Sequence, residues 1–194
     1  MKHEALKIIH EEHRALAALL ETLRLLAERL GPVADPRDLS LIRAIFFYID
    51  EFPERLHHAK ETSLLFPRLR SRAAEAANVL DTLDEQHARG ESAIRELEHL
   101  LLAYEQLGER RRKPFIAALN RYVEFYTGHM AIEDTQVMPL AEKRLTEEDW
   151  RELNAAFAEN RDPLTGHTPS EEYAALFERI VTMAPAPIGL GPER

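Results

Sequence analysis

Apolar residues recur at alternating steps of three and four along the first 30 residues, which is the spacing of one face of an α-helix. This seam predicts a helix over residues 3–30, ended by a Gly-Pro pair. A second helix is expected over residues 35–69, because an Asp-Pro pair is typical of a helix start. Pro53 lies inside that helix and should kink or split it, since proline has no N–H to donate.

Two further long seams predict helices over residues 74–107 and 113–145. Pro139 stands late in the second of these helices and should bend or end it. Thr146 and Asp149 then have the pattern of a cap, which predicts a shorter fifth helix that ends near residue 159.

The last part of the chain is expected to be less regular. A loop rich in Pro, Gly, Asp and Thr covers residues 160–169, and Ser170 should cap a sixth helix. From Ala184 onward, prolines and glycines predict an extended tail. No alternating apolar and polar run of strand length occurs, so the predicted fold class is all-α.

Two segments, in the second and fourth predicted helices, repeat one another. Each contains a histidine, a glutamate four residues later, a short apolar run and a proline. Residues i and i+4 lie on one face of a helix, so each segment aims an imidazole and a carboxylate in the same direction. The pairs are His57 with Glu61 and His129 with Glu133.

The first and third helices each carry one histidine on an otherwise apolar seam, His13 and His87. Each precedes the histidine of the next repeated pair by a similar distance, 44 and 42 residues. A duplicated helix pair explains this spacing and packs most simply as an antiparallel up-down four-helix bundle. We therefore expect a bundle domain over residues 1–145, and a C-terminal helical extension over residues 146–194 that packs on the bundle.

Composition narrows the function classes. The chain has 194 residues and a net charge of −9, which argues against a nucleic-acid footprint and against adhesion to an anionic membrane. It contains no cysteine, which excludes disulfides, thiolate zinc sites and cysteine-bound iron–sulfur clusters. The N-terminus does not resemble a signal peptide, and no apolar run approaches the roughly 18 residues of a membrane span. We expect a cytoplasmic protein.

Polar side chains on a bundle seam are costly unless they are satisfied, at roughly 1–3 kcal/mol for each buried unpaired group. The four seam histidines and two glutamates could each be hydrogen-bonded separately. A bound metal is the favoured interpretation, because burying Glu61 and Glu133 without a cation is costly or forces their protonation.

Six or seven protein ligands exceed what one tetrahedral zinc ion needs. We therefore expect two metal ions bridged by Glu61 and Glu133, with a bridging hydroxide or oxide supplying further negative charge. Mixed imidazole and carboxylate ligation favours iron as the metal, ahead of manganese and zinc.

These segments resemble the hemerythrin family, and most closely its HHE cation-binding branch. The resemblance rests on Glu12-His13-Arg14, on the two His-x-x-x-Glu segments with their prolines, and on the helix of His87. It covers about residues 1–145 and implies an up-down bundle around a non-heme di-iron centre that can react with dioxygen. The family's metal ligands fall by position on His13, His57, Glu61, His87, His129 and Glu133.

Two departures from the oxygen-carrying hemerythrins bear on function. The carriers have a second histidine four residues before the third-helix ligand, where this chain has Leu83. They also take an aspartate five residues after the fourth-helix histidine, where Asp134 stands beside Glu133. Glu133 is preferred because it repeats Glu61, and Asp134 is the alternative ligand or a partner of one. Both departures favour binding or sensing of iron, dioxygen or nitric oxide over bulk oxygen carriage.

The remaining histidines rank below these ligands. His58 should point about 100° away from His57, toward solvent or a neighbouring helix. His10 lies one turn before His13 and is expected at the rim of the site. Three histidines have no ligand partner in the pattern, and they are His3, His99 and His167.

Tyr126 and Gly90 each lie one helical turn from a predicted ligand, and each has two interpretations. Tyr126 either hydrogen-bonds a ligand or bound oxygen, or only packs in the core. Gly90 either leaves room beside the metals or lets two helices approach closely.

Three function classes remain open. A protein that binds or senses a diatomic gas is preferred, with a second copy or a protein partner expected at the C-terminal extension. A ferritin-like di-iron oxidase, or another peroxide- or nitric-oxide-handling enzyme, is the first alternative. That oxidase class uses paired Glu-x-x-His motifs, and the chain has one at Glu54 and His57 but Tyr126 where the second requires glutamate. A purely structural bundle without metal is the second alternative.

Overall fold

The computed structural model describes residues 3–160, 162–186 and 188–191, and its regular structure within these ranges is helical, without strands. The α-helices are α1 (Glu4–Arg29), α2 (Pro36–Ile49), α3 (Phe66–Arg72), α4 (Ala77–Leu107), α5 (Glu109–Ile132), α6 (Met138–Arg144), α7 (Glu147–Phe157) and α8 (Ala174–Met183). π-Helical segments cover Asp50–His58, Glu61–Leu65 and Glu133–Val137, and 3₁₀ turns cover Ala74–Ala76 and Pro163–Thr165.

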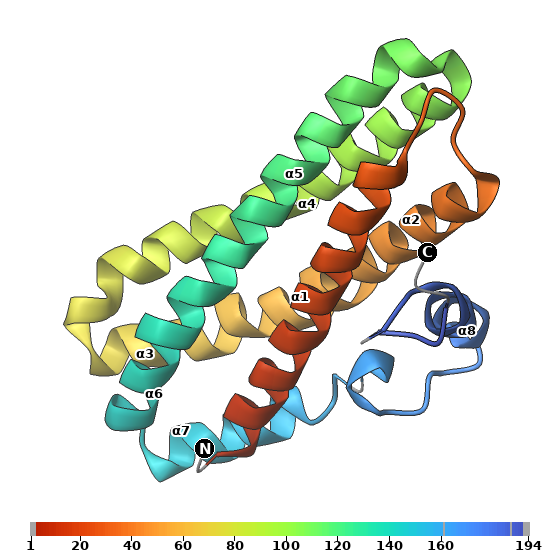
Figure 1. Ribbon diagram of the computed structural model, residues 1–194. Coiled ribbons are helices and arrows are strands. Elements are labelled where there is room, and N and C mark those ends of the chain that lie inside the picture. The colour runs from red at the N-terminus through yellow and green to blue at the C-terminus, as the bar shows by residue number, and fades with distance from the viewer. Residues whose placement is uncertain (1–2, 161, 187, 192–194) are drawn as a thin grey trace.

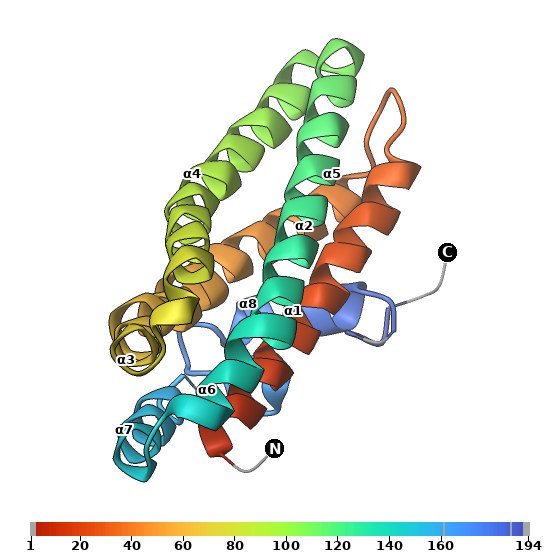
Figure 2. The ribbon, with the colours of Figure 1, turned by 90° about the vertical axis from the view of Figure 1, so that its left-hand side faces the viewer.

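The long helices enclose a common interior (Figure 1). α1 packs against α5 and α2, and α4 packs against the same two helices. α7 lies beside α1 at one end of the molecule, where α3 and α6 also lie, and α8 lies against α2 (Figures 1 and 2). This arrangement is consistent with the hemerythrin-like helical bundle expected from the sequence.

Two apolar clusters fill the interior. The first apolar cluster includes Leu16, Ile45, Phe46, Ile94, Phe115 and Leu119. The second apolar cluster includes Leu6, Ile9, Leu83, Phe66, Trp150 and Phe157. Along α1, buried His13 falls between Ile9 of the second cluster and Leu16 of the first. A polar layer therefore separates the two apolar clusters.

Local signals explain several of the helix ends. The side chain of Asp35 accepts a hydrogen bond from the backbone N–H of Arg37 at 2.8 Å, which caps α2. Thr146 and Asp149 form the expected capping box at the start of α7. Gly108 has a φ of 71°, a conformation that glycine adopts easily, and it turns the chain from α4 directly into α5.

That turn corrects the predicted start of the fourth long helix. α5 begins at Glu109 and contains Pro114, although the sequence suggested a start near residue 113. Pro114 is therefore inside the helix, one turn after its start, where it has no N–H to donate to the preceding turn. The helix therefore starts as soon as Gly108 has reversed the chain.

The C-terminal part differs from the sequence prediction in two respects. Ser170 begins a turn and is not the cap of a helix, because α8 starts only at Ala174. The tail folds back on α8, where the backbone N–H of Leu190 donates to the carbonyl oxygen of Val181 at 2.7 Å. The ends of the two predicted domains, residues 1–2 and 192–194, lie outside the described residues.

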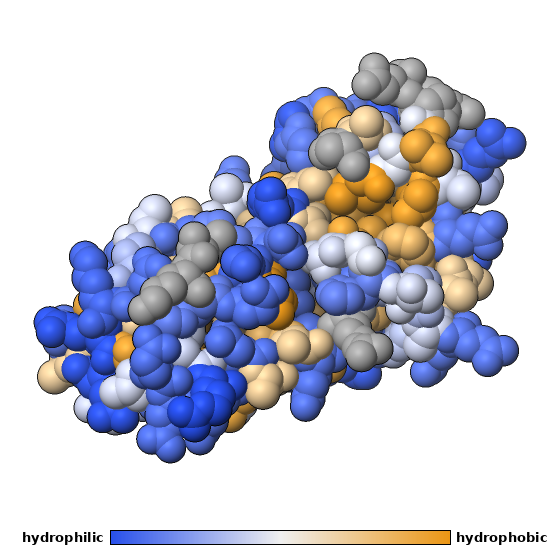
Figure 3. Space-filling model, turned by 90° about the horizontal axis from the view of Figure 1, so that it is seen from below, coloured by the Kyte–Doolittle hydropathy of each residue, from blue (hydrophilic) through white to orange (hydrophobic). Residues whose placement is uncertain are grey.

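The surface adds one observation on environment. Seen from below, the molecule is mainly hydrophilic toward the end with α3 and α7, and apolar surface gathers toward α8 (Figure 3). Among the described residues, no helix combines the length and the apolar character needed to cross a lipid bilayer.

Candidate metal centre

The residues predicted as ligands all lie buried in the polar layer, and they come from four stretches of the chain. α1 supplies His13, α4 supplies His87, and α5 supplies His129. The π-helical segments supply the remaining ligand candidates, which are His57, Glu61 and Glu133. Both glutamates are fully buried, with 0% of their surface exposed.

One group consists of His13, His57, Glu61 and Glu133, whose ligand atoms all lie within 4.8 Å of one another. The Nε2 atoms of His13 and His57 are 3.2 Å apart. His13 Nε2 lies 3.3 Å from a carboxylate oxygen of Glu133, and His57 Nε2 lies 3.3 Å from one of Glu61. This group offers two imidazoles and two carboxylates to one ion.

A second group consists of His58, Glu61, His87 and His129, under the same 4.8 Å limit. The Nε2 atoms of His87 and His129 are 3.2 Å apart. Glu61 belongs to both groups, and Glu133 approaches the second group at 3.7 Å from His87 and 3.3 Å from His129. Both glutamates therefore lie between the two groups.

The glutamates provide a test of whether a metal fits this site. Among the described residues, none of the four carboxylate oxygens of Glu61 and Glu133 has a hydrogen-bond partner. Burial raises the pKa of Glu61, and the nearby charge of Glu133 raises it further. Unpaired buried carboxylates facing several imidazoles are costly unless a cation satisfies them, so this set of donors fits a metal site.

Hydrogen bonds to residues outside the two groups orient the imidazoles of both groups. In each ring the Nδ1 atom has a hydrogen-bond partner, and its N–H can donate there while Nε2 keeps a free lone pair. The Nδ1 partners are Asp134 for His13, Glu12 for His57, Glu54 for His58, Thr62 for His87 and Gln86 for His129, at 2.7–3.1 Å.

Asp134, the alternative ligand, takes part in this outer layer. It is outside both groups and accepts a hydrogen bond from His13 Nδ1 at 3.0 Å. Burial alone would lower the pKa of His13, but Asp134 and the nearby Glu133 raise it to about 9. The geometry therefore favours Glu133 as the carboxylate that joins the candidate ligands and Asp134 as a partner of His13.

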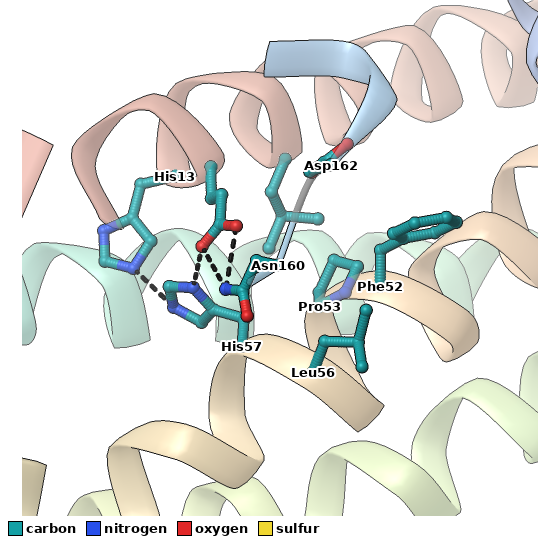
Figure 4. A pocket seen from close by; sticks show the side chains of 9 residues that line it. His13, Phe52, Pro53, Leu56, His57, Asn160 and Asp162 are labelled. Carbon is teal, nitrogen blue, oxygen red and sulfur yellow. Dashed lines mark hydrogen bonds and ion pairs between the residues drawn. The ribbon is translucent and has the colours of Figure 1, made fainter. Parts of the chain in front are cut away.

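Glu12 and Asn160 are two buried residues to which the sequence analysis gave no role in the site. Glu12 accepts hydrogen bonds from His57 Nδ1 at 2.7 Å and from the amide nitrogen of Asn160 at 2.9 and 3.1 Å (Figure 4). Asn160 in turn accepts from Lys60 at 2.5 Å. No local pattern signals this contact, because residues 12 and 160 are 148 positions apart.

A small pocket opens beside His13 and His57 (Figure 4). Its volume is about 10 Å³, close to the smallest cavity that admits one water molecule. Its apolar wall is formed by Leu16, Phe52, Pro53 and Leu56. The pocket therefore reaches the two histidines of the first group, and it is too small for a large substrate.

The prolines of the two repeated segments, Pro67 and Pro139, each follow a widened helical turn. The N–H of Phe66 donates to the carbonyl of Glu61, and the N–H of Met138 donates to that of Glu133. Both are i→i−5 bonds, and a proline follows directly in each case. Widened turns of this kind are frequent at functional sites, and here each one begins at a glutamate of the metal site.

His58 takes the second of its two expected placements. A solvated position was one of its two expected placements, but the side chain is only 4% exposed. Its ring stacks on that of His87, with centroids 4.3 Å apart, so it packs on a neighbouring helix and also enters the second group.

Tyr126 and Gly90 belong to one contact. The hydroxyl of Tyr126 donates to Glu54, whose other oxygen accepts from His58 Nδ1 at 3.1 Å. A Cβ atom on Gly90 would lie 2.0 Å from that hydroxyl. Gly90 therefore provides space for the Tyr126–Glu54 pair.

The other histidines lie away from both groups. His10 is at the rim, with Nδ1 3.5 Å from Asp134. His3 is buried and stacks on Trp150, with ring centroids 4.1 Å apart. His99 and His167 are exposed.

A comparison of the sequence with models of protein families gives a match. A family model described as "Hemerythrin HHE cation binding domain" matches residues 4–141. This range contains all residues of the two groups and ends before α7, so Asn160 lies outside it. A comparison with curated proteins gives no match.

Proposed function

Because this chain belongs to the hemerythrin HHE cation-binding family, we propose that it binds two iron ions and uses them to bind or sense dioxygen or nitric oxide. Residues 1–145 form the metal-binding unit, an antiparallel up-down four-helix bundle. Residues 146–194 form an extension packed on it. Glu61 and Glu133 would hold both ions, and His13, His57, His87 and His129 would be further ligands.

One observation carries this proposal. The four unpaired oxygens of Glu61 and Glu133 lie between two sets of imidazoles whose outer nitrogens are all occupied. Carboxylates without hydrogen bonds are expected where cations replace the missing donors. Mixed nitrogen and oxygen donors, with no cysteine in the chain, suit iron better than a structural zinc site.

The pocket favours a small ligand. When bound, reduced iron supplies electrons to a diatomic gas. The protein restricts what can approach, because the pocket beside His13 and His57 holds only about 10 Å³ and has an apolar wall. Dioxygen and nitric oxide are apolar and small, as a cavity of this size beside the site requires, whereas an organic substrate is too large.

The departures from the oxygen carriers support binding or sensing over bulk carriage. Leu83 is buried in the second apolar cluster, where the carriers have a ligand histidine. The carboxylate facing the metals is Glu133, and Asp134 instead orients His13. The site therefore differs from that of a carrier in its third helix and in its fourth-helix carboxylate.

The oxidase alternative has less support. Its second Glu-x-x-His motif would require a carboxylate at Tyr126, and the Tyr126 hydroxyl instead donates to Glu54. Glu54 lies outside both ligand groups. Consumption of oxygen with steady turnover of a reducible substrate would favour the oxidase.

Metal analysis tests the proposal directly. Protein produced without a His-tag, and reconstituted anaerobically with ferrous iron, is expected to hold about two irons per chain, as the two donor groups require. Its ultraviolet–visible spectrum should change when air or nitric oxide is admitted. Iron content near zero after reconstitution would refute the proposal and leave a structural bundle.

A further inference from the structure

The second group contains a histidine, His58, that the resemblance to the hemerythrin family did not mark as a ligand. The third-helix position that is histidine in oxygen carriers is Leu83 here, and it is fully buried among apolar side chains. His58, from the segment that follows α2, places a ring nitrogen within 4.8 Å of ligand atoms of Glu61, His87 and His129. An imidazole therefore reaches the second group from a different helix.

The directions of two consecutive histidines explain how both take part in one interior. Side chains of consecutive residues in an α-helix diverge by about 100°. They diverge only slightly less in a widened turn such as the π-helical segment Asp50–His58, which contains both residues. His57 and His58 consequently join different groups, one on each side of Glu61.

The surroundings of His58 fix its orientation. Its Nδ1–H donates to Glu54 at 3.1 Å, which leaves Nε2 as the nitrogen with a free lone pair. Glu54 also accepts from the buried hydroxyl of Tyr126. The ring of His58 is stacked on Tyr126, at 5.7 Å and 10°, and on His87, at 4.3 Å and 16°. A carboxylate behind a histidine is the usual device that orients a metal ligand.

We propose that His58 is the third imidazole ligand of the second metal ion, held by Glu54 and Tyr126 as positioning residues. This inference rests on the proposed di-iron function and refines its ligand set. It gives the second ion His58, His87 and His129, and leaves the first ion with His13 and His57. The total number of imidazoles then equals that of the oxygen carriers, but the fifth imidazole comes from the segment after α2 and not from the position of Leu83 in α4.

Cobalt(II) is a suitable probe, because its visible absorption responds to the number and geometry of its ligands. Wild-type protein should bind two cobalt ions per chain. His58→Ala should bind one ion as before and the other about tenfold or more weakly, with a changed visible spectrum. Adding free imidazole to His58→Ala should restore the wild-type spectrum, since the removed ring leaves a site of its own shape.

Matched variants separate ligation from folding. His99→Ala removes an exposed histidine of α4 and should leave both ions and the spectrum unchanged. His58→Asn keeps a polar side chain, so helical circular dichroism like that of wild type, together with loss of the second ion, would exclude misfolding as the cause. Tyr126→Phe should keep two ions but shift the cobalt spectrum, because His58 loses part of its support.

The outcomes distinguish this inference from the proposed function. Two ions of unchanged affinity and spectrum in both His58 variants would overturn the role of His58 and leave the di-metal function standing. If wild-type protein takes up neither cobalt nor iron, both proposals fail.

Discussion

The amide nitrogen of Asn160 donates to both carboxylate oxygens of Glu12, at 2.9 and 3.1 Å. Glu12 in turn accepts from His57 Nδ1 at 2.7 Å. Asn160 lies beyond the residues that match the family, whereas His57 is a predicted ligand. The C-terminal extension therefore contributes to the orientation of a histidine in the metal site.

Replacing Asn160 should weaken metal binding without removing a ligand. Asn160→Ala frees Glu12, so His57 is held less firmly, and the affinity for one of the two ions should fall about tenfold. The measurement is a competition titration with a coloured chelator. Asn154→Ala is the matched control, because Asn154 binds the backbone N–H of Ala5 and fixes α7 to α1 away from the metals. Equal effects of the two variants would mean that only docking of α7 matters.

Replacing Glu61 should remove more bound metal than replacing His57. Glu61 belongs to both groups and His57 to one, so Glu61→Ala should abolish binding of both ions and His57→Ala that of one. Each change should also lower the melting temperature of metal-loaded protein, since bound metal stabilises the folded state. Metal content and calorimetry measure both effects.

His167→Ala is the control for these two variants. His167 is exposed and belongs to neither group, so metal content and melting temperature should not change. Retention of both ions in Glu61→Ala would show that this carboxylate does not bridge them.

The sequence predicted the parts of the site that follow helical periodicity. The seams brought His13, His57, Glu61, His87, His129 and Glu133 to one buried layer, because period 3.6 fixes which side chains face inward. For His58 the structure shows the second of its two expected placements, against a neighbouring helix, but no sequence pattern indicated its approach to Glu61, His87 and His129.

Asn160 was missed for a different reason. Its contact with Glu12 depends on how the chain returns after α7, and no local pattern encodes that return. The start of α5 and of α8 likewise depended on turn geometry at Gly108 and Ser170, which residue preferences describe only loosely.

Gly90 should be intolerant of the smallest possible side chain. Alanine there would place a Cβ atom 2.0 Å from the Tyr126 hydroxyl and 2.8 Å from Glu54, so one of them must move. Gly90→Ala should therefore destabilise the fold by about 1–3 kcal/mol, measured by urea denaturation. The cost should shrink in a Tyr126→Phe background, which lacks the hydroxyl.

Gly128 provides the control for Gly90. It lies within α5, and a Cβ atom added there meets nothing within 4 Å. Gly128→Ala should stabilise the protein by up to about 1 kcal/mol, because alanine is the better helix former. A neutral Gly90→Ala, or a cost that is the same with Phe at position 126, would contradict the role of Gly90.

Asp162 should make stability fall as the pH rises through the mildly acidic range. Burial raises its pKa to about 6, and the hydrogen bonds from Tyr48 and from the N–H of Leu164 offset only part of this. Below about pH 4 the carboxyl is protonated in folded and unfolded chains alike, so it costs nothing. Above about pH 6 it is ionised in both, and the folded state then carries the full cost, about 3 kcal/mol.

Asp162→Asn isolates this contribution from that of other titrating groups. The amide oxygen can still accept from Tyr48 and Leu164, but it carries no charge. The free energy of unfolding of the variant minus that of wild type should therefore be larger at pH 7 than at pH 4. The increase should occur between these two pH values. Urea denaturation of metal-free protein at several pH values measures the difference, since metal release then adds no proton uptake. A difference between the two proteins that does not vary with pH would show that Asp162 ionises as easily in the folded chain as in the unfolded one.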